Sequence, residues 1–455
     1  MRSVRVSRGR LLRGFTALVV GAATVGVAAT PALAQDDPGW VEAQLYDATV
    51  GSPGAPARTV PLTLTSTGAT QPRVTLDLGG LAGVATATFP AACVTEGTSV
   101  TCPMPADATE EFGTVTGTVP VVFRAAPGAA DGAAGTLAYT ALGEQTEPST
   151  QQATITVRSG PDLLDMVDEH VDGVDVGDTH AAPVAVVNAG DQPAVDLRLT
   201  MRFPVGLVPA SYRNCRYGTD QVLATVVVCT VRGTFAPGQR HELRGGLATT
   251  VSPATLGDKR ITQIVEPLAT AGPLPSGVRL THREGDQALR LRPVGKPLGV
   301  IPVEVDGAGG ETYLRAVHGA FDVVAQGAAV TGAVGDTVQV TVGLRNEGPG
   351  VPDGTISGDT VGAFYFTPPA GVTVVGSPRC WQTGSEEEEE NGDDAPKTWY
   401  CDGGRAVFTA GTSNTVTFDL RIDSLSGTPG EIQRYGSFPR VDDNPTNDVA
   451  PVSVS

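Results

Sequence analysis

The chain has few histidines, few lysines and few aromatic residues. Among its 455 residues, five are histidine, and phenylalanine, tryptophan and tyrosine together make up 5%. No two histidines are spaced four residues apart, and neither Gly-x-Ser-x-Gly nor Cys-x-x-Cys occurs. The familiar sequence patterns of zinc proteases, serine hydrolases and thiol redox proteins are therefore excluded. We predict that the protein is not an enzyme, has no catalytic residues and binds no cofactor or metal.

Basic residues are outnumbered by acidic ones, 31 to 49, which gives a formal net charge of −18 at pH 7. A surface of that sign repels the phosphates of nucleic acids and of anionic lipids. We expect no nucleic-acid partner.

The first 34 residues have the parts of a secretory signal peptide. Five arginines between Arg2 and Arg13 precede an uncharged segment, 14–34, which ends in Ala32-Leu33-Ala34. This order predicts cleavage between Ala34 and Gln35. The alternative is an N-terminal membrane anchor, because the uncharged segment spans 21 residues and its length would permit a span.

No later apolar segment has spanning length, and no Leu-Pro-x-Thr-Gly sorting signal is present. We expect no transmembrane segment after signal cleavage. The protein is then secreted and extracellular, either free or associated with the cell wall without a covalent bond.

Short segments of alternating apolar and polar residues recur along the chain, as at 60–64, 338–342 and 416–422. Turn residues separate them, and glycine and proline are abundant. This period of two predicts an all-β protein built as a sandwich or barrel.

Three consecutive segments share one order of features: 35–159, 160–300 and 308–455. Each begins with a strand that ends in a glycine, and each then carries two cysteines. The first and third close with a proline turn and a last strand. In the second segment, residues 284–291 match that last strand more weakly. A repeated order of this kind predicts three modules of similar fold.

The six cysteines of an exported chain are expected to form disulfides. One local pair per module is the simplest arrangement: Cys93–Cys102, Cys215–Cys229 and Cys380–Cys401. The two cysteines of a pair are 9, 14 and 21 residues apart. This is expected of a duplicated module in which the disulfide is kept and the loop between its cysteines has grown longer. Each bond is expected to stabilise its module by about 2–4 kcal/mol.

The third segment resembles the conserved-repeat domain of unknown function in bacterial cell-surface proteins, such as secreted or wall-associated proteins of actinobacteria. The likeness rests on Asn346-Glu-Gly-Pro349, Pro368-Pro-Ala-Gly-Val372, the cysteine pair and Asn444-Pro-Thr-Asn447. It extends more loosely over the other two segments. The resemblance implies tandem immunoglobulin-like β-sandwiches with a surface or secreted structural role, and it implies no ligand and no catalytic residue.

Three acidic stretches raise the question of a metal. Asp168, His170 and His180 share a stretch with the composition of a linker. The run 386–394, from Glu386 to Asp394, begins with five consecutive glutamates, which repel one another, so we expect a solvated insertion. In the third stretch, from Asp442 to Asp448, Asn and Asp side chains around a proline favour a turn over a calcium site.

Trp381, Trp399 and Tyr400 flank the third cysteine pair. Exposed, these rings would form a carbohydrate-binding or protein-binding site, and packed over the disulfide they would belong to the core. We predict a non-enzymatic structural or adhesive protein, with cell-wall glycan or another surface protein as partner. The alternative is a carbohydrate- or protein-binding set of modules, and a secreted hydrolase comes third.

Overall fold

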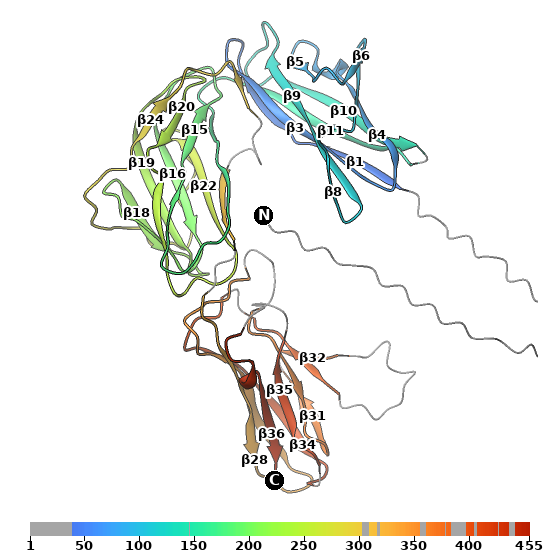
Figure 1. The fold of residues 1–455 in the computed structure, drawn as a ribbon, viewed down its shortest axis with the longest axis vertical. Helices are drawn as coiled ribbons and strands as arrows, with labels where there is room; N and C mark the ends of the chain where they lie inside the picture. The colour runs from blue at the N-terminus through green and yellow to red at the C-terminus, as the bar shows by residue number, and fades with distance from the viewer. Residues whose placement is uncertain are drawn as a thin grey trace, which may run out of the picture. The chain divides into compact units, whose positions relative to one another are not determined.

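The computed structural model describes residues 39–144, 146–302, 309–315, 319–354, 361–377, 379–383, 397–404, 407–425, 427–435 and 442–455. Regular structure in these ranges is β-strand, apart from two short 3₁₀ turns at Gly79–Leu81 and Pro445–Asn447. The predicted all-β class with tandem immunoglobulin-like sandwiches is confirmed (Figure 1). The cleavage site at Ala34 and Gln35 and the acidic run 386–394 lie outside the described residues.

The first sandwich has two main sheets. One has the order β1 (Trp40–Leu45), β3 (Ala57–Thr67), β9 (Thr114–Ala125) and β5 (Ala85–Thr88), and β8 (Thr109–Glu111) and β25 (Val300–Ile301) also join it. The other has the order β2 (Ala48–Gly51), β11 (Ser149–Arg158), β10 (Ala134–Glu144), β4 (Thr70–Asp77), β7 (Ser99–Pro103) and β6 (Val94–Glu96). Side chains of both sheets form one buried core, which includes Leu62, Phe123 and Tyr139.

The second sandwich is built around a seven-stranded sheet. Its order is β13 (Asp168–Val171), β26 (Gly309–Leu314), β22 (Lys259–Pro267), β16 (Ala194–Phe203), β19 (Thr225–Phe235), β18 (Cys215–Thr219) and β23 (Thr281–His282). A four-stranded sheet contains β12 (Leu163–Asp165), β15 (Ala185–Asn188), β20 (Arg240–Leu243) and β24 (Leu291–Val294). A three-stranded sheet contains β14 (Thr179–Ala182), β21 (Leu247–Val251) and β17 (Leu207–Pro209).

The boundary predicted between the second and third modules is wrong at one strand. The repeated order of features predicts residues 309–314 in the third segment, but β26 pairs with β22 over six residue pairs and with β13 in parallel. The predicted closing strand at 284–291 is also not formed as one strand, since regular pairing starts only at Leu291. A strand supplied from further along the chain covers the edge of β22, which the local sequence does not reveal.

The third sandwich has two sheets. One has the order β27 (Val323–Gln326), β29 (Thr337–Asn346), β34 (Ser413–Ile422) and β31 (Val372–Gly376). The other has the order β28 (Ala328–Val330), β36 (Val449–Val454), β35 (Gly430–Arg434), β30 (Phe364–Thr367), β33 (Trp399–Cys401) and β32 (Cys380–Gln382). The alternation predicted at 416–422 is realised in β34, where Val416, Phe418, Leu420 and Ile422 are all buried.

The first strand of this sandwich divides between the two sheets at Gly327. β27 pairs antiparallel with β29, and β28 then pairs parallel with β36. A Cβ atom at Gly327 would collide with the backbone oxygen of Pro451. Glycine is therefore required here because two backbones approach each other closely.

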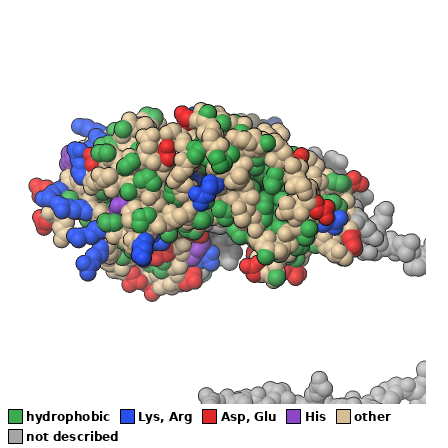
Figure 2. All heavy atoms as spheres, turned by 90° about the horizontal axis from the view of Figure 1, so that it is seen from above, with side chains coloured by type: hydrophobic (Ala, Val, Ile, Leu, Met, Phe, Trp, Pro, Cys, Tyr) green, Lys and Arg blue, Asp and Glu red, His purple; other side chains and the backbone are tan. Residues whose placement is uncertain are grey.

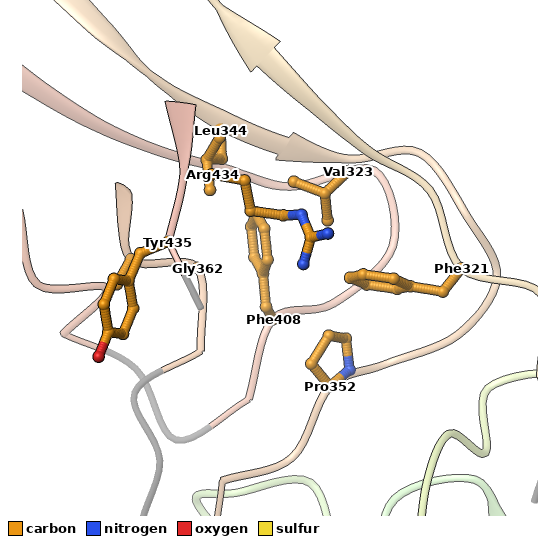
Figure 3. A pocket seen from close by; sticks show the side chains of 9 residues that line it. Phe321, Val323, Leu344, Pro352, Gly362, Phe408, Arg434 and Tyr435 are labelled. Atoms are coloured by element: carbon orange, nitrogen blue, oxygen red, sulfur yellow. The ribbon is translucent and has the colours of Figure 1, made fainter. Parts of the chain in front are cut away.

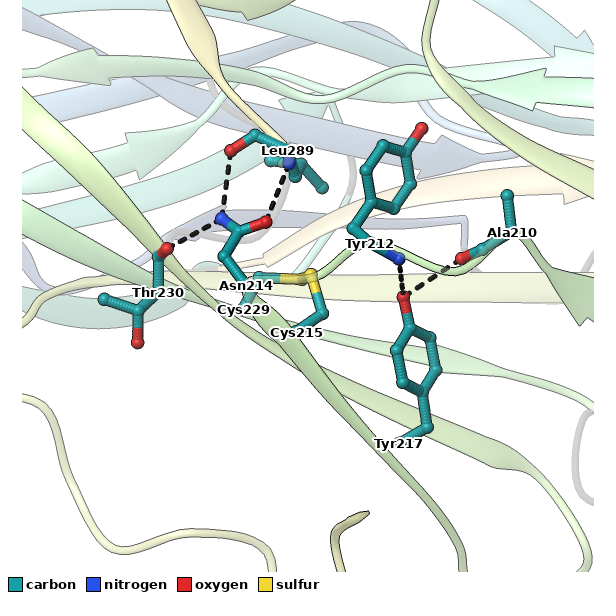
Figure 4. Close-up of a disulfide and its surroundings, with 8 residues drawn as sticks. All are labelled: Ala210, Tyr212, Asn214, Cys215, Tyr217, Cys229, Thr230 and Leu289. Atoms are coloured by element: carbon teal, nitrogen blue, oxygen red, sulfur yellow. Dashed lines mark hydrogen bonds between the residues drawn. A yellow bond between two sulfur atoms is a disulfide. The ribbon is translucent and has the colours of Figure 1, made fainter. Parts of the chain in front are cut away.

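The structure contains the disulfides Cys93–Cys102, Cys215–Cys229 and Cys380–Cys401. In the second sandwich, Cys215 and Cys229 lie directly opposite on β18 and β19. Beside them, Asn214 Nδ2 donates to the backbone oxygens of Thr230 and Leu289 at 2.8 and 3.0 Å (Figure 4). The Cys215–Cys229 bond is thus a cross-strand disulfide between two paired antiparallel strands.

Candidate binding surface

Three aromatic side chains lie side by side across the outer face of one sheet in the third sandwich. In the antiparallel register of β32, β33 and β30, Trp381 is opposite Tyr400, and Tyr400 is opposite Tyr365. Successive side chains of a strand point to opposite faces. The neighbouring row, Cys380, Cys401 and Phe364, belongs to or packs against the buried core, so Trp381, Tyr400 and Tyr365 point away from it.

Tyr435, which follows β35, completes the group. Its ring centroid lies 5.3 Å from that of Tyr365 and 4.7 Å from that of Tyr400, in edge-to-face geometry. Trp381 lies 4.7 Å from Tyr400, and Tyr365 lies 5.8 Å from Tyr400. We call Tyr365, Trp381, Tyr400 and Tyr435 the aromatic face. Edge-to-face pairs at these distances are mutually favourable, so the three tyrosine rings support one another's positions, and the ring of Trp381 packs at a tilt against Tyr400.

The outermost rings of the aromatic face are open to solvent: Trp381 is 55% exposed and Tyr435 40%. The largest apolar patch on a monomeric protein is often functional. On the face of the molecule seen in Figure 2, by contrast, hydrophobic side chains lie in small groups between polar ones.

Trp399 does not belong to this surface. It is one residue before Tyr400 on β33, so it points to the opposite side of the sheet, where its ring lies 6.4 Å from Phe418 and packs against the core. Trp381, Trp399 and Tyr400 were grouped in the prediction because they flank the third cysteine pair, whereas the strand register separates Trp399 from the other two.

Sequence reasoning missed Tyr365 and Tyr435. The segment 364–366 reads Phe-Tyr-Phe. If the two phenylalanines are buried, the alternation of a strand predicts that Tyr365 points to the opposite, outer face. That signal does not say which strand lies beside Tyr365. The pairing with β33 brings Tyr365 and Tyr400 together although they are 35 residues apart.

Polar side chains border the aromatic face. Gln433 is opposite Tyr365 on β35 and exposed. The row two residues further along carries Thr398 and Thr367, whose hydroxyls lie 3.3 Å apart, and Glu431, opposite Thr367. The face is therefore an apolar strip with hydroxyl, amide and carboxylate groups along its side.

A hollow that Tyr435 helps to line is too small for a ligand. It is lined by Phe321, Pro352, Phe408 and Arg434 among others, and its volume is about 10 Å³, close to the space of one water molecule. In Figure 3 the guanidinium of Arg434 extends towards Phe321 and Val323, while Tyr435 stands apart from them. A second hollow, beside Ser424 and Pro429, measures about 50 Å³, far below the ~300 Å³ of small substrate pockets.

The histidines of the 168–180 stretch make separate pairs. His180 Nε2 lies 3.1 Å from Glu169 Oε2, and His170 Nε2 lies 3.5 Å from Asp168 Oδ1. The ring of His170 stacks on Tyr313 at 4.8 Å. Within the described ranges, no group of three His, Cys, Asp or Glu side chains is arranged to hold a metal ion.

The acidic turn from Asp442 to Asp448 uses its carboxylates as backbone caps. Asp442 Oδ2 accepts from the backbone nitrogen of Val323 at 2.9 Å, and Asp443 Oδ2 accepts from that of Phe321 at 2.9 Å. Asp448 pairs with Arg434 at 3.1 Å. These contacts agree with the turn rather than a calcium loop.

No protein-family model matches the chain, and no curated protein matches it. Solved structures with a similar arrangement include a three-domain fragment of titin, I67–I69, at 8% identity and a TM-score of 0.17, which covers 92% of this chain and 98% of the fragment. Another is Dpr2 Ig1-Ig2 in complex with DIP-Theta Ig1-Ig3, at 10% identity and a TM-score of 0.24. The match covers 92% of this chain and 99% of that one. A third is BcpA, the major pilin subunit of Bacillus cereus, at 10% identity and a TM-score of 0.18. The match covers 59% of this chain and 70% of that one. Scores this low add nothing to the assignment of function.

Proposed function

We propose that this chain is a secreted or cell-surface protein with a structural or adhesive role and no enzymatic activity. The observation that carries the proposal is the contrast within the third sandwich. Among the residues that the structure describes, its interior packs around a core, and two hollows there measure 10 and 50 Å³, while four aromatic rings gather on its outer face. Catalysis needs groups that converge on a substrate pocket, whereas adhesion needs an exposed surface.

Several finer points belong to the same proposal. The N-terminal signal, with cleavage after Ala34, supports export, and three disulfides fit an oxidising compartment. In the described part of the chain, no helix has the length and apolar character to cross a membrane. The motifs of the third module support a relationship to the conserved-repeat domain of bacterial surface proteins, and the division into three modules, with 309–314 moved to the second, is proposed with it.

The second candidate function is a binding module set for carbohydrate or protein, and the aromatic face favours it. Nothing in the described residues favours the secreted hydrolase.

The proposal is tested with beads coated with residues 35–455. We expect them to stay bound to cells that secrete the protein through repeated washing, while albumin-coated beads are released. Equal release of both, together with recovery of all the native protein from the medium, would contradict an adhesive role at the surface. An N-terminus at Gln35 in the mature protein, measured by intact mass, tests export.

A further inference from the structure

The aromatic face is too small to be a stable protein interface by itself. Tryptophan and tyrosine side chains have on the order of 150–250 Å² each. With Trp381 55% and Tyr435 40% exposed and Tyr365 and Tyr400 half-buried, the face offers on the order of 300 Å². A specific protein interface requires about 800 Å² from each partner. A few linked sugar rings, each about the size of one aromatic ring, match the available area.

The chemistry of the border fits a ligand rich in hydroxyl groups. The rings offer flat apolar surfaces to the C–H faces of sugars. Gln433 beside Tyr365, and Thr398 and Thr367 in the next row, can each donate and accept hydrogen bonds. Polar groups placed along an apolar strip give orientation to a ligand that stacks on the strip.

The charges argue for a neutral ligand. The chain carries a formal charge of −18, and Glu431 is exposed at the border of the face. Arg434, which directly precedes Tyr435, is paired with Asp448 at 3.1 Å. A polyanionic glycan would be repelled by this surface.

We propose that the aromatic face binds a neutral polysaccharide by stacking sugar rings on Trp381 and Tyr435, with Gln433 as a hydrogen-bonding partner. This inference rests on the adhesive role proposed above and names the class of ligand for it.

The test measures retention of the full mature chain in gels containing dextran, laminarin, mannan or the neutral wall polysaccharide of the producing cells. Polygalacturonate and polylysine serve as anionic and cationic probes. We expect retention by at least one neutral polymer, and roughly tenfold weaker binding after Trp381→Ala or Tyr435→Ala. Bound polymer should also shift the tryptophan fluorescence of the native chain and leave that of Trp381→Ala unchanged.

Matched controls come from the first sandwich. Trp40 is 45% exposed and Tyr46 58%, so Trp40→Ala and Tyr46→Ala remove the same residue types at similar exposure and should retain full binding. Melting temperatures of all variants show that each is folded.

Four results overturn the inference. They are retention by polylysine alone, retention by a neutral polymer that Trp381→Ala leaves unchanged, equal losses with Trp40→Ala, and no retention by any neutral polymer. If neutral polymers fail but coated beads still adhere to cells and Trp381→Ala releases them, the face is adhesive towards another partner, and only the ligand class is wrong. If adhesion also fails, the proposed function fails with it.

Discussion

Asn188 and Asn346 make the same hydrogen bonds in two different sandwiches. Each is fully buried. Each side chain donates to the backbone oxygen four residues later, of Gln192 or Gly350, and to that of a phenylalanine, Phe235 or Phe408, at 2.8–2.9 Å. Each also accepts from the backbone nitrogen two residues later, of Gly190 or Gly348, at 3.0 and 3.1 Å.

This shared arrangement explains the repeated Asn-x-Gly at the end of a strand. Because the amide is buried and its donors and acceptor are satisfied, its hydrogen bonds offset the cost of desolvation and fix the turn against a neighbouring segment. The first sandwich has the buried Ser66 at the matching position, and a hydroxyl there cannot make the same set of contacts.

Replacement of this asparagine should destabilise its sandwich strongly. Asn346→Ala leaves the backbone oxygens of Gly350 and Phe408 buried without this donor, and we expect a loss of about 3 kcal/mol in the free energy of unfolding. The exposed Asn444→Ala should cost less than about 1 kcal/mol. Denaturant unfolding measures both, and equal losses would contradict the role of the buried amide.

The disulfides should be local in the mature protein. Peptide mapping without reduction should link Cys93 to Cys102, Cys215 to Cys229 and Cys380 to Cys401. Replacing Cys215 and Cys229 together with serine should cost about 2–4 kcal/mol, because the unfolded chain regains the entropy of an open loop. A bond between cysteines of different sandwiches would refute this arrangement.

Substitution of the two tryptophans of the third sandwich should affect the stability of the sandwich to very different extents. Trp399→Ala removes a ring that packs on the core near Phe418, and we expect a loss of about 3 kcal/mol. Trp381→Ala removes an exposed ring and should change the free energy of unfolding by about 0.5 kcal/mol. Hydrogen exchange of peptides from β34 reports the stability of this sandwich in each variant. Greater loss in Trp381→Ala would place Trp381 in the core.

The second sandwich should lose stability in mild acid because of His241. Its ring is buried 4.6 Å from Phe235, and burial lowers the pKa of His241 below its ordinary value, although a hydrogen bond from Nδ1 to the oxygen of Gln239 at 3.2 Å opposes the shift. The unfolded chain therefore takes up the proton first, so stability present above about pH 6.5 falls as the pH drops towards the folded-state pKa.

We expect the melting temperature to fall between pH 7 and pH 5 by a few degrees more in the native chain than in His241→Gln. The exposed His282→Gln should keep the native slope. Parallel slopes for all three proteins would show that His241 does not cause the loss.

The sequence by itself determined the strands in which apolar and polar residues alternate clearly, and it predicted one local disulfide per module. A period of two is a local property, since burial of one face of a strand can be read from consecutive residues, as at Val416, Phe418, Leu420 and Ile422. The repeated order of features then assigned two cysteines to each module, and local closure left one pair for each. Both inferences need only residues that are close in the chain.

Only the tertiary structure decided which strands are neighbours. Pairing between distant strands depends on the total burial of two sheets, so no local pattern could show that β26 lies beside β22, or that Tyr365 lies beside Tyr400. The same long-range pairing turned Trp399 into the core and left Trp381 outside. The aromatic face exists because β30, β32 and β33 align their outward side chains in one row and Tyr435, after β35, packs against two of them.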